Sequence, residues 1–242
     1  MNKRPVLALV CMAFAAAARS QTINEIPLAA GSFPAGITAG PDGNVWFVEE
    51  RGDRIGRLSP TGTLTEFPIA VPGSFPRDIA TGPDGNLWFT ELTGRIGRIT
   101  PSGVVTEATI PIRPAEPIFI TAGSDGNLWF TDYYDRIGRL TTSGLITYFV
   151  LTAGSGPRDI TRGPDGAVWF TEVNVGKIGR AVPDGTLSEF TLPDPNAEPN
   201  GITTGPDGNL WFTEFSTSRI GRLTPAGDLT EFPLAGGAEP TG

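Results

Sequence analysis

Apolar and polar positions along the chain alternate in the manner of short β-strands, and residues 76–107 show this best. The bulky segment Leu87–Glu91 and the segment Arg95–Thr100, in which polar residues alternate with apolar or small ones, are typical of strands. Turn-forming residues flank them, with Pro-Asp-Gly within 82–86 and Pro-Ser-Gly at 101–103. Together with an extended stretch on either side, the pattern predicts four antiparallel strands in one unit.

This unit occurs five times, and each copy carries one tryptophan followed by an aromatic phenylalanine. The tryptophans are Trp46, Trp88, Trp129, Trp169 and Trp211, with spacings of 42, 41, 40 and 42 residues. Such a period, with several strands per unit, predicts an all-β fold: a β-propeller of four-stranded antiparallel blades, with five complete repeats present. We expect the propeller to span residues 21–242, with blades at about 34–70, 76–113, 117–152, 157–193 and 199–235.

Two further positions recur in every unit. A glycine lies inside the Arg-Ile-Gly-Arg strand, at Gly56, Gly97, Gly138, Gly179 and Gly221. Glycine in a strand indicates close approach of another group, which we expect to be the tryptophan ring. An aspartate precedes the turn glycine, at Asp42, Asp84, Asp125, Asp165 and Asp207, and we interpret it as a turn former rather than a metal ligand.

The first 20 residues have the pattern of a secretory signal peptide. Lys3 and Arg4 precede the apolar run Val6–Ala18, which is too short to span a bilayer, and small residues follow it. We therefore expect cleavage between Ala18 and Gln21, and a secreted or periplasmic protein with no stable membrane anchor. An uncleaved anchor is the alternative.

Composition limits the function classes. Cleavage would remove Cys11, the only cysteine, and would leave 15 basic and 26 acidic residues, a formal net charge of −11. This acidic balance argues against nucleic acid as a partner and leaves a small-molecule ligand or an extracellular partner. The sequence contains no histidine, so no Ser-His or Cys-His nucleophile can be built.

Both ends of the chain resemble parts of the repeat. Residues 23–28 match the fourth strand of other units, so we expect a ring-closing strand there. Residues 238–242 match the segment that opens the fifth unit, so we expect a sixth blade to start there. These matches favour a fragment of a larger ring that is a monomer when complete. The alternative, a complete five-bladed ring with a redundant strand, would leave an exposed edge.

The motif Ile-Thr-x-Gly-Pro-Asp-Gly-Asn-Leu-Trp-Phe-Thr-Glu, with Arg-Ile-Gly-Arg-Ile-Thr-Pro after it, resembles the virginiamycin B lyase (streptogramin B lyase) family over residues 22–242. The resemblance implies a seven-bladed propeller. It also implies an elimination that opens the lactone ring of type B streptogramins, with a histidine base and Mg²⁺ as cofactor.

In that family the histidines follow the proline that opens a blade. The corresponding slot holds Ala35, Arg77, Ile118, Arg158, Asn200 and Thr241 in this chain. Thr241 falls in the slot of the penultimate-blade histidine and cannot act as that base. The residues present therefore do not support the Mg²⁺-dependent chemistry that the resemblance implies.

Two sets of residues are candidates for the side of the propeller where blades open, here called the top face. A recurring carboxylate ends the Trp-Phe motif, at Glu49, Glu91, Asp132, Glu172 and Glu214. We expect these groups either to form a ring that binds a hard cation or to pair with the base that starts the next strand. The residues that depart from the repeat predict a small-molecule pocket: Arg77, Asp78, Phe119, Tyr133, Arg158, Asp159, Asn200 and Glu239.

Three functions remain open from the sequence. The first is an enzyme of the streptogramin lyase type. The second is a non-catalytic secreted propeller that binds a small molecule, glycan or protein on its top face. The third is a calcium-dependent lactonase similar to regucalcin, which would use carboxylates instead of histidine. Fold alone does not choose among them.

Overall fold

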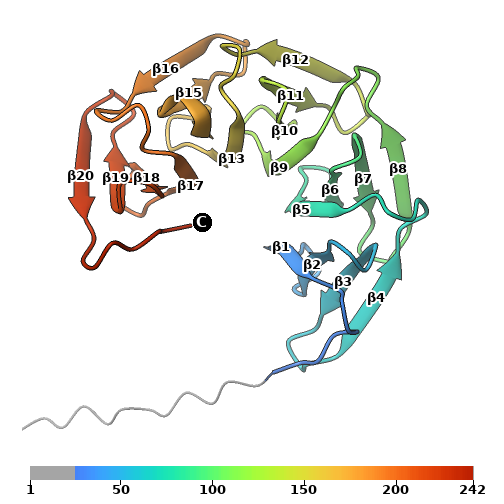
Figure 1. Ribbon diagram of the computed structural model, residues 1–242. Helices are drawn as coiled ribbons and strands as arrows, with labels where there is room; N and C mark the ends of the chain where they lie inside the picture. Colours follow the sequence, from blue (N-terminus) through green and yellow to red (C-terminus); the bar gives the residue numbers. More distant parts are fainter. Residues whose placement is uncertain (1–24, 242) are drawn as a thin grey trace, which may run out of the picture.

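The computed structural model describes residues 25–241, and the predicted signal peptide lies outside them. In this part of the chain, 20 strands form five four-stranded sheets, and one three-residue 3-10 turn (Val173–Val175) is the sole helical element. Strands pair antiparallel in chain order within each sheet. Figure 1 shows the sheets as blades around an arc, which confirms the predicted all-β propeller architecture.

The blades have nearly identical strand lengths. Blade 1 contains β1 (Pro34–Ala39), β2 (Val45–Glu49), β3 (Arg54–Leu58) and β4 (Leu64–Pro68). Blade 2 contains β5 (Pro76–Thr81), β6 (Leu87–Glu91), β7 (Arg95–Ile99) and β8 (Val105–Thr109). Blade 3 contains β9 (Pro117–Ala122), β10 (Leu128–Asp132), β11 (Arg136–Leu140) and β12 (Ile146–Val150). Blade 4 contains β13 (Pro157–Arg162), β14 (Val168–Glu172), β15 (Lys177–Ala181) and β16 (Leu187–Thr191). Blade 5 contains β17 (Pro199–Thr204), β18 (Leu210–Glu214), β19 (Arg219–Leu223) and β20 (Leu229–Pro233).

The register defines the two rims of the molecule. The first strand of each blade is innermost in Figure 1, and the fourth is outermost. In blade 1, Pro34 at the start of β1 lies opposite Glu49 at the end of β2, while Ala39 lies opposite Val45. The opening prolines and the motif carboxylates therefore share the top face, and the Pro-Asp-Gly turns lie on the opposite rim, here called the bottom.

The core lies between successive blades. The tryptophan of one blade packs against the first three strands of the next, as Trp129 does with Ile160, Val168 and Phe170. Trp46, Trp88 and Trp169 make the corresponding clusters at the other three interfaces. A blade cannot bury its own two faces, so this stacking supplies most of the hydrophobic stabilisation.

The repeated glycine and aspartate have separate structural roles. A side chain at Gly97 would overlap the ring of Phe89, so the group that approaches this strand is the phenylalanine; our prediction of the tryptophan was wrong. The tryptophan instead lies over the glycine that precedes the turn, such as Gly82. Its indole Nε1 donates to the turn aspartate, at 3.1 Å between Trp88 and Asp84. The same bond is present in all five blades, which confirms the structural interpretation of these aspartates.

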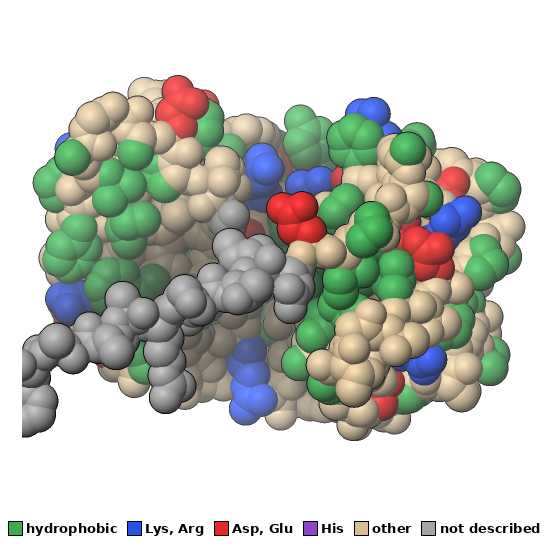
Figure 2. All heavy atoms as spheres, turned by 90° about the horizontal axis from the view of Figure 1, so that it is seen from below, with side chains coloured by type: hydrophobic (Ala, Val, Ile, Leu, Met, Phe, Trp, Pro, Cys, Tyr) green, Lys and Arg blue, Asp and Glu red, His purple; other side chains and the backbone are tan. Residues whose placement is uncertain are grey.

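The first and fifth blades each present one uncovered face at the opening of the arc. Ile37 is 67% exposed, whereas its counterpart Ile79 in blade 2 is 3% exposed. On the other side of the opening, Trp211 and Ile220 line a shallow apolar hollow. Figure 2, which looks toward this opening, shows hydrophobic side chains on both parts of the molecule that border it.

The chain near both ends does not form the strands that the repeat pattern predicts. Residues 25–28 are irregular, and Ile26 and Leu28 lie against the uncovered face of blade 1. Residues 23 and 24 lie outside the described residues. Residues 238–241 are also irregular, because no second strand is present there to pair with them. No helix in the described chain has the length and apolar character needed to cross a membrane.

Candidate functional site

Two adjoining cavities open on the top face at the inner ends of the blades. One has a volume of about 290 Å³ and is lined mainly by blades 2, 3 and 4. The other has a volume of about 440 Å³ and extends toward blades 1 and 5. Arg77 and Arg158 line both cavities and lie at the boundary between them.

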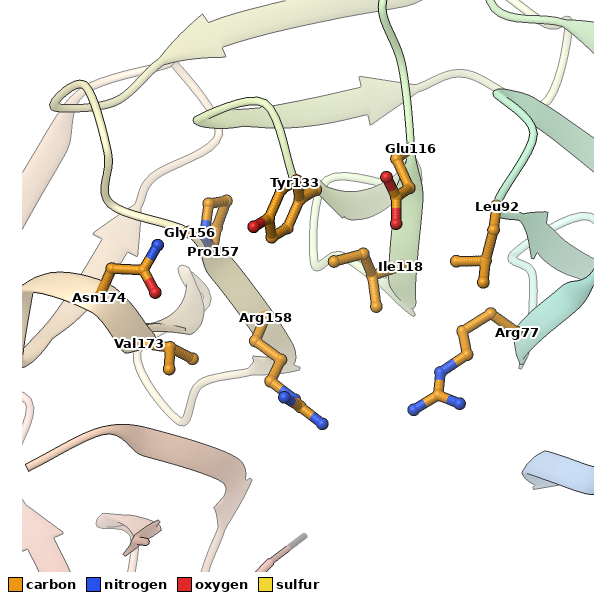
Figure 3. Close-up of a pocket in the computed structure, with 10 residues that line it drawn as sticks. All are labelled: Arg77, Leu92, Glu116, Ile118, Tyr133, Gly156, Pro157, Arg158, Val173 and Asn174. Carbon is orange, nitrogen blue, oxygen red and sulfur yellow. The ribbon is translucent and has the colours of Figure 1, made fainter. Parts of the chain in front are cut away.

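The two arginines occupy equivalent positions in blades 2 and 4, directly after the opening proline. Thr131 of blade 3 holds Arg158 in place, because its hydroxyl donates to the Arg158 carbonyl. Arg77 donates to the Glu50 carboxylate at 2.8 Å, and its guanidinium lies over the Phe119 ring at 5.7 Å from the ring centroid. Figure 3 shows both guanidinium groups directed into the open space at the centre.

Arg158 is less compensated than Arg77. Among the described residues its guanidinium makes no ion pair, whereas Arg77 pairs with Glu50. Burial lowers the pKa of Arg158, and the nearby charge of Arg77 lowers it further. Two cations that repel each other therefore face a common cavity.

Asp78 and Asp159 have a structural role that the sequence analysis did not anticipate. The Asp78 carboxylate accepts the backbone N–H of Ile120 in the next blade at 2.9 Å. Asp159 accepts the N–H of Ile202 at 2.7 Å. Burial raises the pKa of Asp78 to about 7 and that of Asp159 to about 6, although the backbone hydrogen bonds oppose the increase. These aspartates join neighbouring blades, and Asp159 also contributes to the wall of the larger cavity.

The other predicted pocket residues separate into two groups. Phe119, Asn200 and Thr241 line the larger cavity, and Tyr133 lines the smaller one. Glu239 is exposed and lines neither.

Sequence reasoning missed several residues of the smaller cavity. Glu116 and Ile118 come from the start of blade 3, Leu92 follows the motif glutamate of blade 2, and Val173 and Asn174 belong to the 3-10 turn of blade 4. The signal that could have found them is the loop after each motif carboxylate, because its first residue differs from blade to blade. This loop lies on the top face in every blade.

The motif carboxylates do not form a ring around the channel. Glu49, Glu91, Asp132, Glu172 and Glu214 are all fully buried inside their own blades. Among residues 25–241, no three acidic, cysteine or histidine residues lie close enough together to hold a metal ion. The predicted hard-cation ring is therefore not formed, because the side chains point into the sheet packing and not toward the centre.

The alternative prediction, pairing with the base of the next strand, applies to two blades. Arg136 contacts Asp132 at 2.7 Å, and Arg95 lies 3.7 Å from Glu91. In the other three blades the base pairs with a glutamate of the fourth strand, in the pairs Arg54–Glu66, Lys177–Glu189 and Arg219–Glu231.

Four blades contain a buried pair of carboxyl groups, one from the second strand and one from the fourth. Burial is the main cause that raises the pKa of Glu49 and Glu91 to about 7, and the nearby Glu66 and Glu107 contribute in the same direction. The pKa of Glu172 is likewise raised to about 7 by burial and by Glu189. At neutral pH such a group is partly protonated, so it is suited to a hydrogen bond with its neighbour and poorly suited to Mg²⁺.

Blade 3 replaces one carboxyl of this pair with a phenol. Tyr148 lies opposite Gly138 in the register, the position that Glu107 occupies opposite Gly97 in blade 2. Burial raises the pKa of Tyr148, and the adjacent Asp132 adds to the effect. A neutral hydroxyl thus substitutes for a protonated carboxyl group, which indicates that these buried pairs are structural.

Comparison with known proteins gives consistent matches over nearly the whole chain. The profile of the virginiamycin B lyase family matches residues 13–242. No curated protein matches the chain. The crystal structure of virginiamycin B lyase from Staphylococcus aureus is 44% identical with a TM-score of 0.87, and the match covers 91% of this chain and 77% of that one.

Two further structures are similar. A catalytically inactive variant of the Staphylococcus aureus enzyme with quinupristin is 44% identical, with a TM-score of 0.86 over 90% of this chain and 75% of that one. A streptogramin B lyase structure is 39% identical, with a TM-score of 0.83 over 87% of this chain and 72% of that one.

Proposed function

The chain belongs to the virginiamycin B lyase family, and we propose that its top face binds a cyclic depsipeptide lactone of the streptogramin B class without opening the ring. The observation that carries this proposal is the pair of adjoining cavities, which combine apolar walls with a few polar groups at the inner ends of the blades. Ligand sites are commonly of this kind. The similar structure that contains quinupristin supports the choice of ligand class.

The proposal stops at binding because the required base is missing. An elimination beside a carbonyl group needs a base whose pKa lies near neutrality. These 242 residues contain no histidine. Thr241, in the slot of a family histidine, lines the larger cavity with a hydroxyl group that remains protonated at neutral pH.

Calorimetric titration of the 242-residue protein with quinupristin tests the proposal. We expect binding, and we expect Ile118→Asp to weaken it about tenfold because a charge in the apolar wall opposes an apolar ligand group. Val150→Asp is the matched control, since Val150 is 75% exposed on the outermost strand of the neighbouring part of blade 3. Thermal unfolding of both variants would show whether they remain folded.

The same sample, incubated with quinupristin and Mg²⁺, tests the absence of catalysis. Elimination isomerises the lactone, so mass is unchanged and chromatographic retention must be the readout. We expect the retention time to stay constant. A new linear product, or equal affinities for the Ile118→Asp variant and the unmodified protein, would contradict the proposal.

We also propose that the protein is exported, which rests on the pattern of residues 1–20 and the acidic balance of the remainder. Expression of the full chain with its native N-terminus in a bacterial host, followed by N-terminal sequencing of the extracytoplasmic fraction, checks this. We expect the sequence to begin between residues 19 and 21. Retention of Met1 in the cytoplasmic fraction would contradict it.

A further inference from the structure

The centre of the top face concentrates positive charge that the protein itself leaves only partly balanced. Arg77 and Arg158 both line the two cavities. Arg77 has one ion pair, with Glu50, and among the described residues Arg158 has none. A guanidinium group carries five N–H donors in a planar arrangement, so donors of both side chains remain available to a ligand.

The nearby carboxylates do not neutralise this pair. Asp159 uses one oxygen for the N–H of Ile202 and the other for its neighbour Ile160. Glu116 lines the smaller cavity, and Figure 3 shows its carboxylate across the cavity from both guanidinium groups. An anion placed between the arginines would therefore meet two cations first, with the acidic group at the far end.

The space beside the arginines is apolar. Leu92, Ile118 and Val173 line the smaller cavity, and the Tyr133 ring completes that wall (Figure 3). At about 290 Å³ the cavity has the size of a small-ligand site. A ligand that fits would have a negatively charged group at one end and an apolar or aromatic body at the other.

We propose that Arg77 and Arg158 together bind the carboxylate of a small organic acid, whose apolar part lies against Ile118, Leu92 and Tyr133. Arginine is well matched to this group because its N–H donors contact both carboxylate oxygens. The inference rests on the proposed function, since it assigns the chemistry of a ligand group in the same top-face site. It adds that the recognised group is anionic, which neither the fold nor the family specifies.

Ligand-observed fluorine NMR with para-fluorophenylacetate tests the inference. We expect saturable binding, weakened about tenfold in Arg158→Gln and in Arg77→Gln, because each substitution removes a charge-assisted hydrogen bond donor. Arg162→Gln is the matched control: Arg162 lies on the same strand β13, at its bottom end and exposed. This control should bind the probe as the unmodified protein does.

Two analogues separate the contributions of charge and apolar body. The neutral para-fluorophenylacetamide should bind at least tenfold more weakly, and inorganic phosphate should compete poorly because it has no apolar part. Equal binding of the amide, equal competition by phosphate, or unchanged affinity in Arg158→Gln would each overturn the inference. Quinupristin binding is measured separately, so failure of the acid to bind leaves the proposed function standing, and failure of quinupristin to bind does not affect the measurement on the acid.

Discussion

The bottom and top rims of the propeller differ in how faithfully they repeat. On the bottom rim, the tryptophan Nε1 donates to the turn aspartate in every blade, at 3.0–3.2 Å. On the top rim, the residue after the opening proline changes from blade to blade, in the order Ala35, Arg77, Ile118, Arg158 and Asn200. Repeated contacts stabilise every blade in the same way, whereas unrepeated side chains give the centre a distinct chemistry. Repetition therefore marks the fold, and its absence marks the candidate site.

The largest expected effect lies at a repeated position. Trp129 is 1% exposed and packs between blades 3 and 4, so Trp129→Ala should lower the free energy of unfolding by about 3–5 kcal/mol. Trp211 occupies the same position at the uncovered face of blade 5, where Trp211→Ala should cost clearly less. Urea unfolding followed by circular dichroism measures both. Similar losses at the two positions would break the link between repetition and interblade packing.

The buried carboxyl pairs sharpen the comparison, because they lie near the top rim and yet recur in four blades. The raised pKa of Glu91, about 7, means that its stabilising contribution is fully present below the unfolded-state pKa of 4.5 and is lost as pH rises through 7. Stability should therefore fall between pH 5 and pH 8, and Glu91→Gln should reduce this fall by about 1–3 kcal/mol.

Blade 3 provides the control for that prediction. Tyr148→Phe removes a phenol that stays protonated across this pH range, so the slope of stability against pH should not change. Denaturant titrations at several pH values give the slopes. If Glu91→Gln left the slope unaltered, the carboxyl pair would be fully ionised and the assignment of a protonated group would be wrong.

The sequence predicts the fold well because its determinants are local and repeated. Alternation, Asp-Gly turns and the spacing of Trp88 and its counterparts suffice to give strands, blades and rims. The identity of the ring that contacts Gly97 depends on which neighbouring strand it faces, and alternation does not specify that. The structure places Phe89 there.

The candidate site is predicted only in part. Arg77, Arg158, Phe119, Tyr133 and Asn200 depart from the repeat, and they do line the cavities. The motif carboxylates were expected at the channel because they lie on the top face, but a side chain's direction depends on the pleat of its strand. Asp78 and Asp159 departed from the repeat for another reason: they hydrogen-bond the next blade across distances that a single sequence does not reveal.

The smallest expected effect on stability belongs to an unrepeated residue. The Arg158 guanidinium makes no ion pair among the described residues, and it faces a second cation, Arg77. Arg158→Gln should therefore change the free energy of unfolding by no more than about 0.5 kcal/mol, as for other substitutions at sites without strong contacts.

Arg136→Gln is the contrasting variant for that measurement. Arg136 lies 2.7 Å from the fully buried Asp132, so its substitution leaves a buried carboxylate without its partner and should be strongly destabilising. Thermal and urea unfolding of the two variants, measured at one pH, gives the difference directly. Equal destabilisation would mean that Arg158 supports the fold as Arg136 does. A stable Arg158→Gln protein instead permits its loss of ligand affinity to be attributed to the site itself.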